Sequence, residues 1–438
     1  MHINHSINWI AHLINRNFIY FYLFVSLLFL LFSGVYSVGG LKVYPAFVIC
    51  LVNVFLLLRN PIKLNVVGFE FCWVVFLVSV FLVSCIINSN YQNIDIVARY
   101  LLKSIFIPLV VVSGLIVTVE RYGIRKQEVL NIVFATLIFQ FLVTLLQLSH
   151  EEFRQVFFNY IELNENWREL VKIGSFRATG LSGLSIFDAS IQIFIIFFLF
   201  FGWAESRYLS NKLKYILVAC LVMFLSAIAG RTGMILVFIL FMLMVFFSKN
   251  RIFYILCFSC IFLFAFFMLV TFSKDDGFLL VIRFVFEPFF SFIEGRGLET
   301  KSTNQLLNEY LFFPFEINPL IGSAYWAQPS VSESSGFLLK SDSGYVLFYI
   351  LIGLPGVFLL LSYSLRSLSV LKQGVVSLYH IGNKRKEKLV VAVFSSFFFL
   401  SVVTIQLKAP IFFSEKIMSA LFLFLLVRAA NFESERRT

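Results

Sequence analysis

The amino-acid sequence predicts an all-α polytopic membrane protein with about twelve transmembrane helices, and three observations carry this prediction. The 438 residues are 60% hydrophobic, include 58 phenylalanines and have a mean hydropathy of +0.91, whereas about half apolar is usual for soluble domains. Apolar runs of about twenty residues, the length that spans a bilayer, recur along the chain. Short segments containing Lys and Arg separate many of these runs. A soluble globular protein is therefore excluded.

Twelve segments fit a membrane-spanning helix in length and composition. They cover residues 18–38, 41–58, 66–87, 101–119, 129–148, 185–203, 215–230, 232–248, 252–272, 343–364, 389–407 and 412–428. Two long breaks of mixed polarity interrupt them, at residues 150–187 and at residues 273–342, between the ninth and tenth spans. We expect one integral membrane domain over residues 1–438 with two large loops.

The distribution of basic residues predicts the orientation. The even-numbered gaps and both termini hold 20 Lys and Arg residues, and the short odd-numbered gaps hold 6. Cytoplasmic segments are the ones enriched in Lys and Arg, so both termini are expected in the cytoplasm and both long loops outside it. The net charge of +11 is explained by this distribution, and no nucleic-acid partner is predicted. All six cysteines lie within apolar runs, and no metal site is predicted.

The first loop ends in a glycine-rich segment that contains Arg177, just before a span that begins with Asp188. Earlier in this loop, Phe153, Phe157 and Tyr160 follow helical spacing with charges between them, which predicts an amphipathic helix. A helix that caps the bundle would have the same pattern. The end of the loop is therefore its more informative part.

Arg231 lies between the seventh and eighth spans, in the sequence AGRTG. These two spans together are shorter than the ~40 residues that two full crossings need, so we expect the hairpin to dip and draw Arg231 toward the membrane. An arginine there costs about 2–3 kcal/mol at the bilayer centre and normally has an anionic partner or a hydrated cavity. The alternative is an interface anchor whose charge reaches the headgroups.

Asp342 stands where the large loop enters the tenth span. It is either the N-cap of that helix or a base that faces an outer cavity. Guanidinium groups bind phosphate oxygens in bidentate fashion. Two outward arginines and a carboxylate therefore suggest a lipid-linked pyrophosphate as ligand, with the carboxylate activating a sugar hydroxyl.

Four segments together resemble the bacterial O-antigen and capsular polysaccharide polymerases of the Wzy type, which share a superfamily with the O-antigen ligases. They are FRATGLSGLSIFDAS before the sixth span, AGRTG, NPLIGS in the large loop, and SDSGYVLFYILIGLPG at the tenth span. The resemblance implies a metal-independent membrane glycosyltransferase without a cofactor, at the periplasmic face of the bacterial inner membrane. The growing glycan leaves undecaprenyl pyrophosphate and joins the non-reducing end of an incoming lipid-linked repeat unit.

The resemblance also implies roles for individual residues. Arg177 and Arg231 would bind and stabilise the pyrophosphate leaving group. Asp342 stands where many relatives, ligases especially, carry His, and is a candidate base; Glu294 and Glu309 are its rivals. Asp188, Glu294 and Glu309 are further candidates for substrate binding.

Two other functions stay open on the sequence. A flippase or exporter of the same lipid-linked sugar would spread ionisable residues through several spans, whereas Glu70, Lys103 and Asp188 fall near span ends. A ligase would transfer the glycan to a lipid A core. The sequence also leaves open the sugars, the linkage, and whether a polysaccharide chain-length regulator binds.

Overall fold

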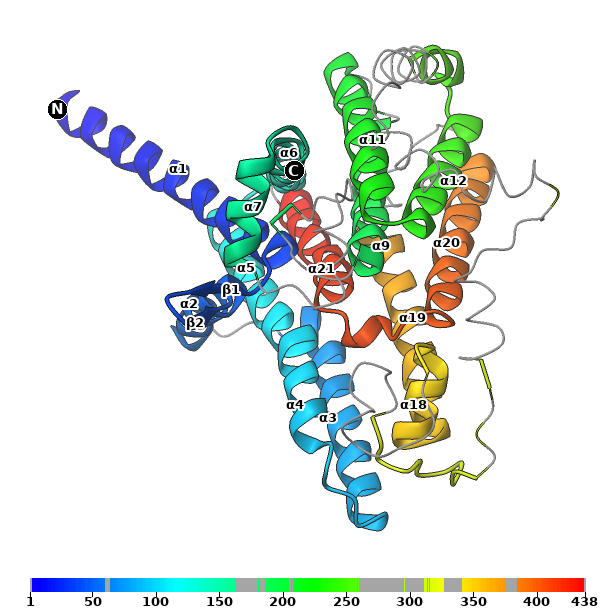
Figure 1. Ribbon diagram of the computed structural model, residues 1–438. Coiled ribbons are helices and arrows are strands. Elements are labelled where there is room, and N and C mark those ends of the chain that lie inside the picture. Colours follow the sequence, from blue (N-terminus) through cyan, green and yellow to red (C-terminus); the bar gives the residue numbers. More distant parts are fainter. Residues whose placement is uncertain are drawn as a thin grey trace.

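A computed structural model describes most of the chain as a bundle of apolar helices (Figure 1). The described residues are 2–59, 64–161, 180–181, 186–204, 206, 208–257, 259, 295, 311–312, 314, 316–326, 341–374 and 384–436. The predicted mostly helical membrane fold is confirmed at this level. Two short strands are the exception among the described residues.

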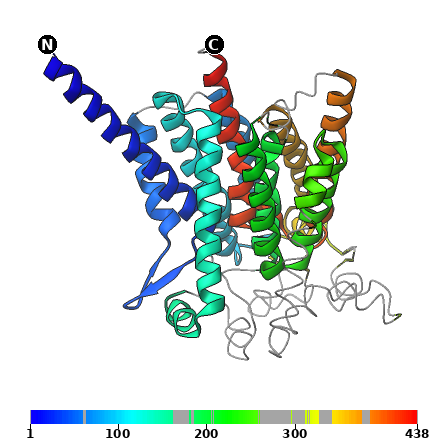
Figure 2. The ribbon, with the colours of Figure 1, turned by 90° about the horizontal axis from the view of Figure 1, so that it is seen from above.

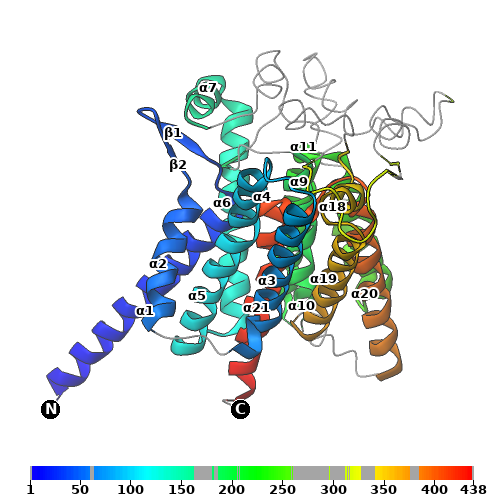
Figure 3. The ribbon, with the colours of Figure 1, turned by 90° about the horizontal axis from the view of Figure 1, so that it is seen from below.

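The first part of the chain supplies seven described α-helices and one π-helical turn. They are α1 (His2–Phe32), α2 (Pro45–Arg59), α3 (Leu64–Ile87), α4 (Ile94–Leu101) continued by the π-helical turn η1 (Leu102–Phe106) and α5 (Ile107–Tyr122), α6 (Lys126–Ser149) and α7 (Glu151–Tyr160). The amphipathic helix predicted in the first loop is α7, and Figure 3 shows it across the end of α6.

The second half completes the bundle. Its elements are α9 (Ile186–Phe197), the 3-10 turn η2 (Phe198–Phe200), α10 (Phe201–Ala204), α11 (Leu209–Ala229), α12 (Arg231–Phe247), α18 (Gly344–Ile352), α19 (Leu354–Gly374), α20 (Lys384–Gln406), the 3-10 turn η5 (Ile411–Phe413) and α21 (Glu415–Arg436).

The first two predicted spans are separated by a β-hairpin, which corrects their boundaries. Strand β1 (Tyr36–Val38) pairs antiparallel with β2 (Leu41–Val43). Gly39 and Gly40 form the turn with φ of 59° and 83°, and a two-residue turn with positive φ at both positions matches the twist of a hairpin. The predicted span 18–38 therefore ends as a helix at Phe32, and the predicted span 41–58 begins at Pro45.

Six described helical segments are long and apolar enough to cross a membrane. They are Val67–Ile87, Ile94–Tyr122, Lys126–Ser149, Leu209–Ala229, Leu354–Lys372 and Lys388–Gln406. Shorter apolar helices cover Arg16–Phe32, Pro45–Arg59, Asp188–Ala204 and Thr232–Phe247. Most of the predicted ninth span, 252–272, lies outside the described residues, so the count of twelve crossings stays a prediction.

The bundle surface is apolar, as a lipid-facing surface must be. Phe18, Phe55 and Phe246 are 67%, 72% and 73% exposed, and large exposed apolar patches are rare on soluble monomers. Helix α21 lies at the centre, where it contacts α1, α5, α6, α9 and α19. Its residues Glu415–Val427 are all buried.

Both marked chain ends lie at one end of the bundle, and the hairpin and α7 lie at the other (Figures 2 and 3). We call the second the hairpin end. The helices α9, α12, α18 and α21 all begin toward the hairpin end. One group of charged side chains lies where these helices start.

Candidate functional site

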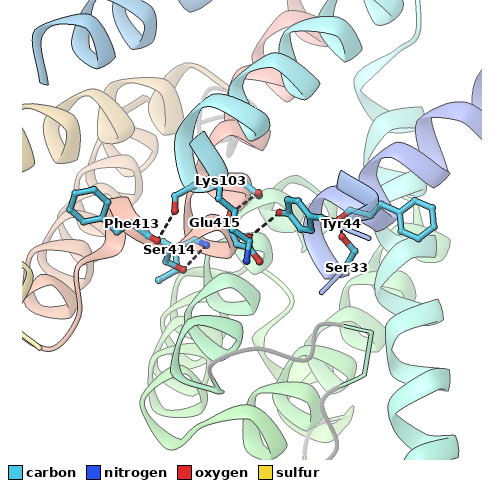
Figure 4. A network of polar contacts seen from close by, with 10 residues as sticks. Ser33, Tyr44, Lys103, Phe413, Ser414 and Glu415 are labelled. Carbon is cyan, nitrogen blue, oxygen red and sulfur yellow. Dashed lines mark hydrogen bonds and ion pairs between the residues drawn. The ribbon is translucent and has the colours of Figure 1, made fainter. Parts of the chain in front are cut away.

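A cluster of buried and half-buried charged and hydroxyl side chains lies where α21 begins (Figure 4). Lys103 Nζ lies 3.2 Å from Glu415 Oε2, and the Tyr44 hydroxyl donates a hydrogen bond of 2.9 Å to the same oxygen. Lys103 Nζ also lies 5.2 Å from the centre of the Tyr44 ring, within the range of a cation–π interaction. Residues from η1, α21 and the start of α2 thus meet around one carboxylate.

The cluster continues to Asp188 and Lys416. The Ser414 hydroxyl bonds to the Asp188 carboxylate, and Ser414 Oγ accepts the Ile417 N–H at 3.4 Å, as an N-cap does. Lys416 interacts electrostatically with Glu415, Lys103 and Asp188. We define the charged cluster by these members: Tyr44, Lys103, Asp188, Ser414, Glu415 and Lys416. It holds two cations and two carboxylates.

Helix lengths place the charged cluster one membrane thickness from the end that holds the termini. Helix α21 has 22 residues, or about 33 Å at ~1.5 Å per residue. Lys103 stands 19 residues before the end of α5 at Tyr122, or about 29 Å. A hydrocarbon core is about 30 Å thick, so the cluster lies about one membrane thickness from the far ends of α5 and α21.

The first turns of α9 and α12, which carry Asp188 and Arg231, pack against each other. A Cβ on Gly233 would lie 2.4 Å from the Ser190 carbonyl oxygen, so the first turns of α9 and α12 are in backbone contact there. Gly230 joins α11 to α12 and Arg231 is the first residue of α12. The side chain of Arg231 lies outside the described residues.

Helix α11 begins at Leu209, six residues before the predicted 215. It is therefore long enough to cross the membrane fully, and only α12 is short.

The segment that follows Arg177 is anchored on α6. Gln147 Nε2 donates to the Gly180 carbonyl and Gln147 Oε1 accepts the Gly180 N–H, both at 2.9 Å. Gln140 Oε1 accepts the Leu181 N–H at 3.1 Å. Gly180 has φ of +56°, and a Cβ there would lie 2.0 Å from Gln140 Nε2. Arg177 itself lies outside the described residues, three positions before this anchor.

Replacing Gln147 with leucine is expected to lower the free energy of unfolding by about 1–3 kcal/mol, because the buried Gly180 N–H and carbonyl would lose their partner. Unfolding of purified protein in detergent measures this effect. Ser149→Ala is the matched control on the same helix: the Ser149 hydroxyl is exposed and bonds to the Leu145 carbonyl of its own helix, so its loss should change stability by less than about 0.5 kcal/mol. Equal effects of the two variants would contradict the anchoring role.

Asp342 is not the N-cap of α18, which was one of the two roles that the sequence left open. Helix α18 begins at Gly344, with Ser343 at the N-cap position and no side-chain cap bond; the Ser343 N–H donates to Ser341 Oγ at 3.0 Å. Burial raises the pKa of the Asp342 carboxyl above its ordinary value. Its role as a base stays a prediction. Glu294 and Glu309 lie outside the described residues.

The NPLIGS segment is held at a break between α18 and α19. The Ser323 N–H donates to the Ile350 carbonyl at 2.7 Å, and the Leu354 N–H donates to the Pro319 carbonyl at 2.7 Å. Gly322 and Gly353, with φ of +66° and +73°, are in backbone contact. Irregular backbone at membrane depth is tolerated when protein covers it. This segment therefore completes the bundle at the hairpin end.

The sequence pattern did not indicate three members of the charged cluster: Tyr44, Glu415 and Lys416. It placed Lys103 near a span end without a role in the site. The available signal was an ionisable residue inside an apolar run, which marks a functional-site candidate. Among the described residues, no group of three or more His, Cys, Asp or Glu side chains is placed to hold a metal ion.

No protein-family model, curated protein or solved structure matches the chain.

Proposed function

We propose that the chain is a polysaccharide polymerase of the bacterial inner membrane. It would join undecaprenyl-pyrophosphate-linked repeat units into O-antigen or capsular polysaccharide at the periplasmic face, with both termini cytoplasmic and lipid pyrophosphate as leaving group. The observation that carries the proposal is the contact between the first turns of α9 and α12 at Ser190 and Gly233. This contact brings the helix starts that bear Asp188 and Arg231 together, beside the charged cluster.

The location of these groups suits a substrate that lies in the membrane. The lipid tail of the donor would stay in the bilayer, and its pyrophosphate would reach the charged cluster at the hairpin end. Helix N-termini favour anions, and α9, α12 and α21 all begin there. Arg231 and Arg177 would then stabilise the charge that develops on the departing pyrophosphate. A chain-length regulator would be a protein partner at the periplasmic side.

The test is elongation of lipid-linked repeat units by purified protein in detergent, where no compartments exist. Arg231→Ala is expected to lower the elongation rate by about 10²-fold or more, the usual effect of removing one group that stabilises a developing oxyanion. Arg251→Ala is the matched control, because Arg251 is exposed and follows the opposite end of α12. A folded Arg231→Ala variant that makes long glycan at the wild-type rate would overturn the role of Arg231.

A flippase or exporter of the same lipid-linked sugar is the second candidate. The break between α18 and α19 favours it, because transporters use interrupted helices at their substrate sites. Elongation in detergent would exclude transport as the sole function. An O-antigen ligase would need a lipid A core as acceptor. Elongation with lipid-linked repeat units as the only substrate would therefore distinguish a polymerase from a ligase.

A further inference from the structure

Glu415 has a buried carboxylate oxygen that no described group satisfies. Its side chain is 9% exposed. Oε2 receives both the Lys103 ammonium and the Tyr44 hydroxyl, whereas Oε1 has no hydrogen-bond partner among the described residues. Buried polar atoms are nearly always paired, and each exception needs an explanation such as a catalytic role or a bound group. The missing partner of Oε1 must be a donor, because an ionised carboxylate only accepts.

The partners of Glu415 hold its carboxylate in one orientation. The Lys103 ammonium at 3.2 Å and the Tyr44 hydroxyl at 2.9 Å both contact Oε2, and Oε1 is the oxygen without a partner among the described residues. Lys103 stands on the π-helical turn η1, and such turns often occur at functional sites. The Lys103 side chain is 34% exposed, so the ion pair has an accessible side.

Asp342 is the other candidate base at this end of the bundle, and burial raises the pKa of its carboxyl above the ordinary value. Glu415 and Asp342 lie at the same end of the bundle. A Cβ on Gly344, two residues after Asp342, would lie 3.0 Å from the carbonyl oxygen of Ala409, which is six residues before Glu415.

Aromatic rings border the charged cluster. Tyr100 interacts electrostatically with Asp188 and stacks on Trp326 with ring centres 4.7 Å apart. Trp326 in turn packs edge-on against Phe413 at 4.6 Å, two residues before Glu415. The Trp326 indole N–H is also buried without a partner among the described residues. Aromatic walls with a few oriented polar groups are the usual composition of a small-molecule site.

We propose that Glu415 is the general base for the acceptor sugar, with Lys103 and Tyr44 as positioning residues. The inference rests on the proposed polymerase function. The acceptor hydroxyl gives its proton to Glu415 Oε1, and its oxygen forms a bond to the anomeric carbon of the donor glycan. The bond from that carbon to the pyrophosphate oxygen breaks, and the electron pair leaves with the lipid pyrophosphate. The proton on Glu415 then passes to water, which restores the carboxylate.

The experiment measures elongation by purified full-length protein in detergent. The probe is lipid-pyrophosphate-linked repeat units extracted from source cells that lack this chain. Glu415→Gln keeps the size of the side chain and one acceptor oxygen. It is expected to lower kcat by about 10²-fold or more, the usual contribution of a general base, with little change in KM. Glu152→Gln, the same change at an exposed carboxylate on α7, is the control and is expected to keep kcat within about 3-fold. Tyr44→Phe should lower kcat by an intermediate factor, because it removes one positioning bond.

Thermal unfolding of each variant separates chemistry from folding. Glu415→Gln leaves Lys103 without its counter-ion, so the double variant Lys103→Met/Glu415→Gln is prepared beside it; it should melt near the wild-type temperature and still be inactive.

A folded Glu415→Gln or double variant with kcat within 3-fold of wild type would overturn the assignment. So would an equal loss of kcat in the folded Glu152→Gln control, because the effect would then not be specific to Glu415. Folded wild-type protein that elongates nothing would instead overturn the polymerase function, and the assignment with it.

Discussion

Arg366→Ala is expected to lower the free energy of unfolding by about 3–5 kcal/mol, the usual cost of leaving one charge of a buried pair without its partner. Arg366 Nε lies 2.9 Å from Glu70 Oε1 and joins α19 to α3, and the Glu70 side chain is only 2% exposed. The guanidinium also lies 5.1 Å from the centre of the Phe69 ring. Unfolding in detergent or mixed micelles measures the effect.

Arg99→Ala is the matched control for Arg366→Ala. Arg99 pairs with Asp95 at 2.6 Å, but the two side chains are 74% and 64% exposed, and exposed pairs contribute about 0–1 kcal/mol. The neutral double variant Glu70→Gln/Arg366→Met should recover most of the lost stability, because it leaves no unpaired charge. Comparable losses for Arg366→Ala and Arg99→Ala would contradict the buried pair.

Gly233→Ala is expected to destabilise the protein by about 2–3 kcal/mol, although alanine for glycine inside a helix ordinarily stabilises it by about 1 kcal/mol. The added Cβ would meet the Ser190 carbonyl oxygen and carbon at 2.4 and 2.5 Å. These are backbone atoms of α9, so the helices must separate, and forcing extra atoms into a packed interface costs about 1–3 kcal/mol.

The sign of the Gly233→Ala effect is the informative result. Ile235→Val on the same helix is the control, because Ile235 is 43% exposed and its change should stay within about 0.5 kcal/mol. The two variants are compared by unfolding in detergent. If the polymerase proposal holds, Gly233→Ala should also slow elongation, since it shifts the helix start that carries Arg231. A gain in stability would show that α9 and α12 do not pack in this way.

Most helices could be predicted from the sequence because long apolar runs have few alternatives in a membrane. The hairpin at Tyr36–Val43 was missed because its residues are apolar enough to extend the neighbouring spans. The Gly39–Gly40 pair between alternating aromatic and β-branched residues was the signal that would have found it. Helix starts were less predictable: α11 begins at Leu209, within a polar segment that the hydropathy pattern excluded.

The site was only partly predictable. Asp188 is in the charged cluster, and Arg231 starts the helix packed against that of Asp188, as expected for groups at the outer ends of spans. The partners of Glu415 could not be found from sequence, since Tyr44 lies 371 residues away from it. Pairing across such a distance is decided by the packing of α2, α5 and α21. A lone charge in an apolar run shows that a partner is needed, but not which residue supplies it.

The central position of α21 has a consequence for biosynthesis. The helices around it, α1, α5, α6, α9 and α19, all precede it in the chain. At about 5–20 residues per second, the roughly 300 residues between the end of α5 and the end of α21 take on the order of 15–60 s to make. During that interval the surfaces of α5 that α21 will cover must contact lipid, other helices of the chain or a membrane chaperone. Assembly of the bundle, and of the charged cluster with it, is therefore completed only after α21 has been inserted.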